Sequence, residues 1–125
     1  MTPGERIHEG ASLLVTRTKA VPAHIQSRVR EISRVETAPS DRRKGHATRL
    51  MRMVCDEADK RGMLLLLEAK PYESGGMDAA RLECWYACFG FVPLQAEPRI
   101  LARPPGGKWQ APEPRRTLIA ESVNG

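Results

Sequence analysis

The sequence predicts an α/β fold, because a strongly amphipathic helix stands between two segments with the character of strands. The apolar side chains of this helix recur at helical spacing, at Ala47, Leu50, Met51, Val54, Cys55 and Ala58. Residues 25–37 before it favour one or two strands, and Met63–Ala69 after it is a continuous apolar run of strand length. Strand, helix and strand of these lengths make a βαβ unit, in which the two strands run parallel.

Length and composition are those of one domain, residues 1–125, with one hydrophobic core. The chain has 125 residues, 41% of them hydrophobic, and a formal net charge of +5 that favours an anionic partner. The cations are scattered and aromatic side chains for base stacking are few, so nucleic acid is disfavoured as that partner. No apolar stretch approaches the roughly 18 residues of a membrane span, and no signal pattern opens the chain. We therefore expect a cytoplasmic protein with no membrane partner.

The N-terminal part is expected to contribute little regular structure. Met1–Gly10 is polar and carries Pro3 and two glycines, which predict an irregular lead-in. Ala11–Thr18 has the character of a strand. The first regular element is therefore expected at Ala11.

The C-terminal half is expected to hold a second helix and a β-arm. Asp78 is a suitable N-cap for a helix that reaches about Phe89, and Gly90 ends it. A further strand begins at Phe91. The Pro- and Gly-rich part, about 95–125, keeps two pieces of strand character, Arg99–Arg103 and Thr117–Val123, which predict a closing hairpin or β-arm.

The strand before the first helix carries an unusual number of charges. Alternate positions hold Arg28, Arg30, Arg34 and Glu36, with Ile32 the apolar exception, while Val29 and Val35 fall on the other face. A central strand covered on both faces would be apolar throughout. One face of this strand is therefore expected to be partly open or to line a site.

The three cysteines indicate neither a disulfide framework nor a zinc site. Cys84 and Cys88 lie one helical turn apart, but no further cysteine or histidine stands near them in the sequence. We expect buried thiols in a reducing cytosol, and no metal.

The start of the first helix has the composition of a phosphate site. Its first turn and the residues just before it are Arg42, Arg43, Lys44, Gly45, His46, Ala47 and Thr48. Unpaired N–H groups and the positive end of the helix dipole attract anions there, and glycine lets a phosphate approach the backbone. Cations at a helix N-terminus are electrostatically unfavourable unless an anion is bound. Neither a nucleoside-triphosphate P-loop nor a dinucleotide glycine motif is present.

Two motifs resemble those of the GCN5-related N-acetyltransferase (GNAT) superfamily. Arg42, Gly45 and Ala47 match the family's acetyl-coenzyme A loop, in which Arg or Gln precedes Gly by three positions and Gly or Ala by five. Trp85–Phe91 resembles a later motif, in which three residues separate Tyr86 from a Gly-Phe pair. The motifs occur in the family's order, separated by a helix, a strand and a helix. The resemblance covers about residues 29–94.

The resemblance implies a fold and an activity. The fold would be a mixed, mostly antiparallel sheet with a splayed central parallel strand pair, flanked by helices. The activity would be transfer of an acetyl group from acetyl-CoA to a primary amine of a small molecule or a protein lysine, directly in a ternary complex. The alternative is a non-catalytic CoA-binding regulatory or interaction protein that keeps the fold.

The resemblance also assigns roles to individual residues. Arg42–Thr48 would bind the pyrophosphate, and a backbone N–H near Thr37 would bind the thioester carbonyl. Tyr86 would lie beside the sulfur and protonate the departing thiolate, although it also suits a core aromatic position. Glu36 is the preferred general base, with Glu68 as the other candidate, and a salt bridge is the alternative role for both.

The chain departs from the family's pattern in its N-terminal region. Members of the family carry two helices before the strand that feeds the phosphate loop, and residues 1–34 show little helical periodicity. Those helices shape the acceptor pocket, so their reduction predicts an open surface. Such a surface suits a macromolecular acceptor or a homodimer interface.

Overall fold

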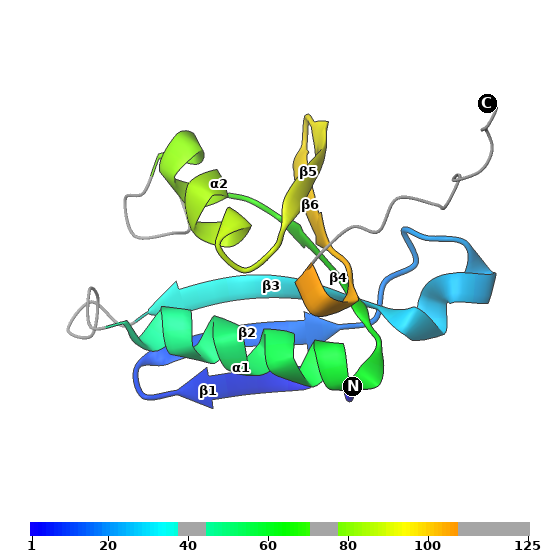
Figure 1. Ribbon diagram of the computed structural model, residues 1–125, viewed down its shortest axis with the longest axis horizontal. Helices are drawn as coiled ribbons and strands as arrows, with labels where there is room; N and C mark the ends of the chain where they lie inside the picture. Colours follow the sequence, from blue (N-terminus) through cyan, green and yellow to red (C-terminus); the bar gives the residue numbers. More distant parts are fainter. Residues whose placement is uncertain (38–44, 71–77, 108–125) are drawn as a thin grey trace, which may run out of the picture.

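The computed structural model describes residues 1–37, 45–70 and 78–107, which form one six-stranded sheet and two α-helices (Figure 1). The strands are β1 Gly4–His8, β2 Ala11–Thr16, β3 Val29–Thr37, β4 Leu64–Glu68, β5 Val92–Ala96 and β6 Arg99–Arg103. The α-helices are α1 His46–Arg61 and α2 Ala79–Ala87, and two 3-10 helices are η1 Ala23–Arg28 and η4 Pro105–Gly107. The predicted α/β class is confirmed.

The sheet is mostly antiparallel, and the parallel pair among its described strands is β3 with β4. The strand order is β1-β2-β3-β4-β6-β5. Val29–Ile32 of β3 pair with Leu64–Leu67 of β4, and β3 then continues to Thr37 beside β2. α1 connects the parallel strands, as the predicted βαβ unit requires. Past their last paired residues β3 and β4 separate, so the sheet opens at its centre.

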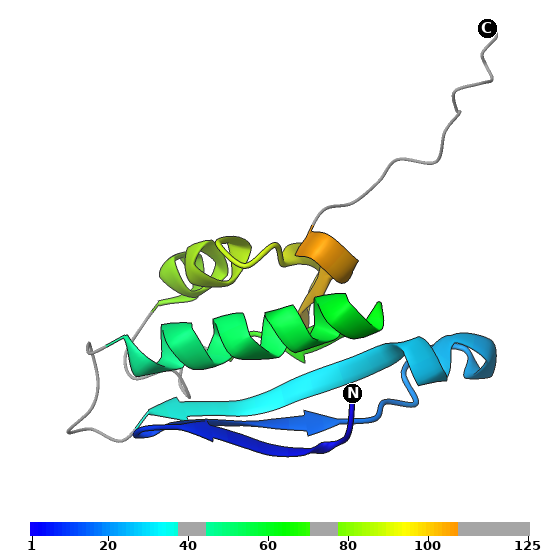
Figure 2. The same cartoon turned by 60° about the horizontal axis from the view of Figure 1, so that its bottom comes forward.

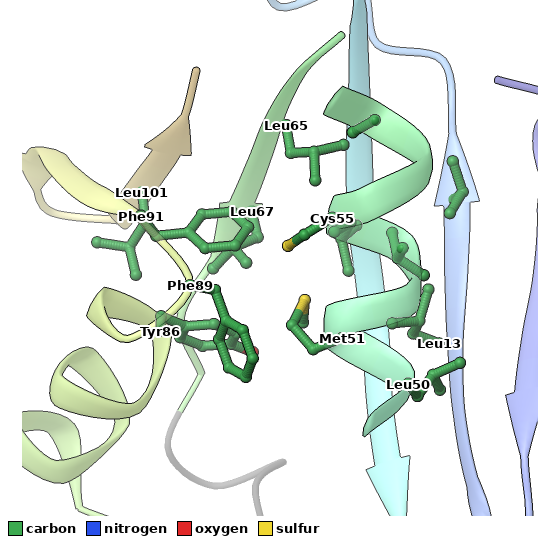
Figure 3. Packing of buried hydrophobic residues seen from close by; sticks show 14 of the residues in the cluster. Leu13, Leu50, Met51, Cys55, Leu65, Leu67, Tyr86, Phe89, Phe91 and Leu101 are labelled. Carbon is green, nitrogen blue, oxygen red and sulfur yellow. The ribbon is translucent and has the colours of Figure 1, made fainter. Parts of the chain in front are cut away.

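The apolar stripe of α1 forms the middle of the hydrophobic core. Its buried residues are Leu50, Met51, Val54, Cys55 and Ala58, and Ala47 packs against them partly buried. Figure 3 shows Met51 and Cys55 pointing from α1 toward Phe89 and Phe91, which follow α2 in the chain. Alternate residues of the sheet complete the core, among them Leu13, Val15, Leu65, Leu67 and Leu101. This packing fixes α1 relative to the C-terminal end of α2.

The predicted C-cap of α1 and N-cap of α2 are confirmed, whereas α2 ends at Ala87, two residues before the predicted Phe89. Gly62 is the C-cap of α1, and its N–H donates to carbonyls of Ala58 and Asp59. The Asp78 side chain accepts a hydrogen bond from Arg81 N–H at 2.8 Å and caps α2. Gly90 follows α2 with a φ of 96°, and a Cβ there would lie 2.6 Å from Cα of Gly107. Only glycine permits this contact between the end of α2 and η4.

The N-terminal region is more regular than predicted. Gly4–His8, expected in an irregular lead-in, forms β1 and pairs with β2 along its whole length. The ladder of the hairpin, closed by a turn in which Glu9 has a φ of 55°, outweighs the weak strand propensity of this polar segment. Residues 25–28, expected in a strand, belong instead to η1.

The first of the two strands predicted in the Pro- and Gly-rich C-terminal part is confirmed. Arg99–Arg103 forms β6 and pairs antiparallel with β5. The second predicted piece, Thr117–Val123, lies outside the described residues.

A β-bulge in β3 changes which face its side chains occupy. Ser12 of β2 pairs with Glu36 and Leu14 pairs with Ser33, so β3 has one extra residue in this interval. Arg34 lies there with a φ of 55°. The expected alternation along the strand is therefore wrong beyond Ser33. Glu36 lies on the face opposite Ile32, although both have even numbers.

Both α-helices lie on the same side of the sheet (Figure 2). Residues from α1 and α2 belong to one buried cluster with the sheet residues that face them. Within residues 1–37 the helical segment is η1, six residues long, as the predicted reduction of the N-terminal helices implies. None of the described helices is long and apolar enough to cross a membrane.

Candidate functional site

α1 begins at a glycine in the left-handed backbone conformation. Gly45 is the N-cap, with φ 79° and ψ 10°, values that an L side chain adopts only with strain. The first turn holds no acidic residue and no side-chain cap. Arg49 N–H donates to the Gly45 carbonyl at 3.0 Å, so the amides just before Arg49 precede the hydrogen bonds of the helix. Such a start is chemically suited to an anion.

The predicted pyrophosphate-binding residues are only partly described. Arg42, Arg43 and Lys44 lie outside the described residues. His46, Ala47 and Thr48 form the first turn of α1. Their role in binding pyrophosphate therefore remains a prediction.

Two side chains of this first turn contact other elements. Thr48 Oγ1 accepts a hydrogen bond from Trp85 Nε1 at 3.2 Å, which ties the start of α1 to α2. The ring of His46 meets that of His8 on β1 edge-on, with 5.8 Å between centroids. Because the Thr48 hydroxyl is the acceptor in this bond, its own proton can be donated to a ligand. The ring of His46 is turned toward the sheet.

A small cavity lies where β3 and β4 separate, and we call it the β3–β4 slot. Its volume is about 20 Å³, and its lining residues are Ile32, Ser33, Arg34, Val35, Glu68, Lys70 and Tyr86. They come from the bulged part of β3, from the end of β4 and from α2. The slot therefore places Tyr86, the residue predicted to protonate the thiolate, beside the gap between β3 and β4.

Tyr86 reaches the slot from within the core. It is 4% exposed and shares the buried face of α2 with Leu82. Its ring lies 5.0 Å from that of Trp85 and 5.6 Å from that of Phe91, both in edge-to-face contact. The two roles considered for Tyr86 are thus compatible, because one side chain both packs in the core and lines the slot.

The two candidate bases differ in their relation to the slot. Glu68 lines it, whereas Glu36 is exposed and is absent from its lining. The bulge is the reason, since the extra residue alters the direction of the side chains that follow it. Thr37 is half-buried at the end of β3, opposite Ala11 of β2.

Sequence reasoning missed two charged residues of the slot, Arg34 and Lys70. A signal for Lys70 existed, because ligands of α/β proteins gather at the carboxyl ends of parallel strands and Lys70 closely follows β4. Arg34 lies in the bulge, for which the sequence has no recognisable pattern.

The cysteines differ from the prediction of buried thiols. Cys55 is buried, and burial raises the pKa of its thiol to about 11, so it stays protonated at neutral pH. Cys84 and Cys88 are exposed, because α2 turns Leu82 and Tyr86 toward the core. Among the described residues, no group of three or more His, Cys, Asp or Glu side chains is arranged to hold a metal ion.

Comparison with known proteins identifies the fold by its three-dimensional form. No protein-family model matches the sequence, and no curated protein matches it. The crystal structure of the anti-CRISPR protein AcrVA5 matches with a TM-score of 0.57 and 19% identity, over 82% of this chain and 98% of that one.

Structures of acetyltransferases also match. The ribosomal-protein-S18-alanine N-acetyltransferase from Escherichia coli has a TM-score of 0.56 and 20% identity, over 83% of this chain and 64% of that one. The GNAT family N-acetyltransferase YhbS from Escherichia coli, in complex with CoA, has a TM-score of 0.51 and 11% identity, over 74% of this chain and 49% of that one. The present chain thus spans about half to just under two thirds of these two enzymes. At such identities the likeness shows the fold, which is that of the GNAT superfamily.

Proposed function

We propose, from the GNAT fold of this chain, that it is an acetyl-CoA-dependent N-acetyltransferase built as one domain over residues 1–125. The observation that carries the proposal is the β3–β4 slot, in which Tyr86 and Glu68 meet at the separated ends of the parallel strands. The glycine start of α1 supports it, because the same helix connects those two strands and offers its first-turn amides to an anion.

Acetyl-CoA is the donor substrate in this proposal. Arg42–Thr48 bind its pyrophosphate through backbone amides and cationic side chains. The arm that carries the thioester follows the end of β3 toward the slot, where a backbone N–H near Thr37 stabilises the oxyanion.

Tyr86 acts as general acid. The amine nitrogen of the acceptor forms a bond to the thioester carbonyl carbon, and the carbon–sulfur bond then breaks. A phenol with a pKa of about 10 is protonated at neutral pH and can give its proton to a departing thiolate, whose conjugate thiol has a pKa of about 8.5. Lys70 and Arg34 beside the slot favour the transient negative charge.

The proton that the ammonium loses goes to a carboxylate, directly or through water. Glu68 lines the slot and is the better-placed base, and Glu36 is the other candidate from β3. Glu68→Gln and Glu36→Gln distinguish them. The true base loses about a hundredfold in kcat near neutral pH and regains activity as the pH rises, because free amine then becomes available. The other substitution leaves the pH profile unchanged.

The deciding experiment measures CoA release from acetyl-CoA with a panel of primary amines, including N-acetyl-lysine amide and lysine peptides. Liquid chromatography is the appropriate readout, because the exposed thiols of Cys84 and Cys88 would themselves consume a disulfide reagent. Calorimetry with CoA runs in parallel. Acetylated product supports the proposal, whereas CoA binding with no product from any amine supports the non-catalytic alternative. Absence of CoA binding refutes both.

A further inference from the structure

One face of the sheet is covered by neither α1 nor α2 in the described structure, and of its residues Val29 and Ala102 are buried. The strand register assigns it Glu5 and Ile7 of β1, Ser12, Leu14 and Thr16 of β2, Val29, Glu31, Ser33 and Glu36 of β3, Leu64, Leu66 and Glu68 of β4, Val92 and Gln95 of β5, and Ile100 and Ala102 of β6. We call this set the open face. α1 and α2 both lie on the opposite side (Figure 2), and no described helix spans the open face.

Strand arginines face the helices. Arg6 pairs with Glu57 of α1 at 3.5 Å, and Arg103 pairs with Asp59 of α1 at 2.7 Å. Arg99 pairs with Glu83 of α2. These contacts place Arg6, Arg99 and Arg103 on the side away from the open face and neutralise them there. Arg30 donates to the carbonyls of Met1 and Val29, and Arg34 lies in the bulge beside the slot.

Strand glutamates face the other way. The register gives the open face Glu5, Glu31, Glu36 and Glu68 and no arginine or lysine. Within the described residues none of the four forms an ion pair or a side-chain hydrogen bond. The open face is therefore acidic, in a chain whose formal net charge is +5.

Apolar side chains occupy the space between these carboxylates. Leu14, Leu64, Leu66 and Ile100 are only partly buried, and Ile7 is 63% exposed. A surface that combines unpaired carboxylates with uncovered leucines complements a polypeptide of alternating cationic and apolar side chains. A small neutral amine would use none of this surface.

The open face leads into the β3–β4 slot. Glu68 belongs to both, and Glu36 lies near the end of β3, where the parallel strands have separated. A segment lying across the open face therefore brings one of its own side chains to the slot.

We infer that the acceptor is a lysine within a basic polypeptide segment that docks on the open face. The carboxylates hold the cationic side chains that flank the lysine, and the leucines contact its apolar neighbours. The inference rests on the proposed acetyltransfer at the slot. It selects one substrate class among the primary amines.

The test compares three acceptors: a single-lysine peptide flanked by arginine and leucine, its counterpart with glutamate for arginine, and N-acetyl-lysine amide. At low salt we expect kcat/KM for the arginine peptide to exceed that for the glutamate peptide about a hundredfold. The ratio should fall toward one at about 1 M ionic strength, where the Debye length is roughly 3 Å. Equal values at low salt would overturn the inference.

Variants locate the docking surface. The double substitution Glu5→Gln, Glu31→Gln should raise KM for the arginine peptide about tenfold, with kcat and turnover of N-acetyl-lysine amide unchanged. Glu97→Gln, in the turn between β5 and β6, is the matched control and should change nothing. An unchanged KM in the double variant refutes docking on the open face.

Binding of the fluorescent arginine peptide, followed by anisotropy, separates the two proposals. In one outcome the peptide binds, the double variant weakens this binding, and no acetylated product forms. That outcome supports the docking surface and refutes the catalytic proposal. In the other outcome the protein acetylates N-acetyl-lysine amide but does not bind the arginine peptide preferentially. That outcome supports the acetyltransferase proposal and refutes the docking surface.

Discussion

The ion pair between Asp59 of α1 and Arg103 of β6 is expected to be the most consequential polar contact in the described structure. The two guanidinium N–H groups donate to the carboxylate at 2.7 and 3.0 Å, and Gly106 N–H donates to it at 2.6 Å. Arg103 Nε also donates to the carbonyl of Phe89 after α2. One pair therefore joins α1, α2, β6 and η4.

Asp59→Ala should destabilise the protein by about 3 kcal/mol. The Arg103 side chain is 7% exposed, so the substitution leaves a buried charge without its partner, which typically costs about 3–5 kcal/mol. The Asp59 side chain is 31% exposed, so water can partly replace the lost interaction. The expected cost is therefore at the lower end of that range. For a chain of this length the change lowers Tm by roughly 10 °C.

Thermal and urea unfolding at neutral pH measure the effect. Glu57→Ala is the control on the same helix, because its pair with Arg6 is longer, 3.5 Å, and is worth under about 1 kcal/mol. The reasoning fails if the two variants lose similar stability.

The pH dependence gives a second, independent readout. Hydrogen bonds from Arg103 hold the pKa of Asp59 below its ordinary value, against the opposing effect of burial. The stability from Asp59 is therefore fully present above its unfolded pKa of about 3.9 and is lost as the pH falls through the lower folded pKa. The gap between wild type and Asp59→Asn should be constant above about pH 5 and narrow below pH 4.

Three further predictions concern the candidate site and the thiols. Tyr86→Phe should lower kcat about a hundredfold while calorimetry shows unchanged CoA affinity, and full activity would leave Tyr86 a structural residue. Gly45→Asp should abolish CoA binding and Gly45→Asn should weaken it far less, because both side chains tolerate positive φ and only one is charged; equal affinities would remove the phosphate assignment. In iodoacetamide labelling at pH 8, followed by mass spectrometry, Cys84 and Cys88 should react while Cys55 reacts only after unfolding. Fast labelling of Cys55 in the folded protein would contradict its burial.

The elements with a strong local signal were predictable from the sequence. The stripe of α1, the apolar run of β4 and the caps Gly62 and Asp78 each rest on contacts within a few residues. The structure confirms all of them. The GNAT fold followed from two motifs in the right order, one at Arg42, Gly45 and Ala47 and the other at Trp85–Phe91.

The remaining features depend on contacts between distant residues. β1 exists because β2 lies beside it, and a polar segment with one apolar residue carries no such signal. The preference for Glu36 over Glu68 rested on its place at the end of the strand, and the bulge at Arg34, which decides the face that Glu36 occupies, is set by pairing with β2. The exposure of Cys84 likewise follows from which side of α2 meets the core.

The bulge in β3 inserts one extra residue partway along the strand. β3 pairs with β2 on both sides of the bulge, with the register shifted by one residue beyond it, and Val29–Ile32 also pair with β4. Deleting Arg34 would remove the extra residue and restore uninterrupted alternation, and Glu36 would stay opposite Ser12 on the open face. The extra residue thus adds a cationic side chain to the lining of the slot without moving the Glu36 carboxylate off the open face.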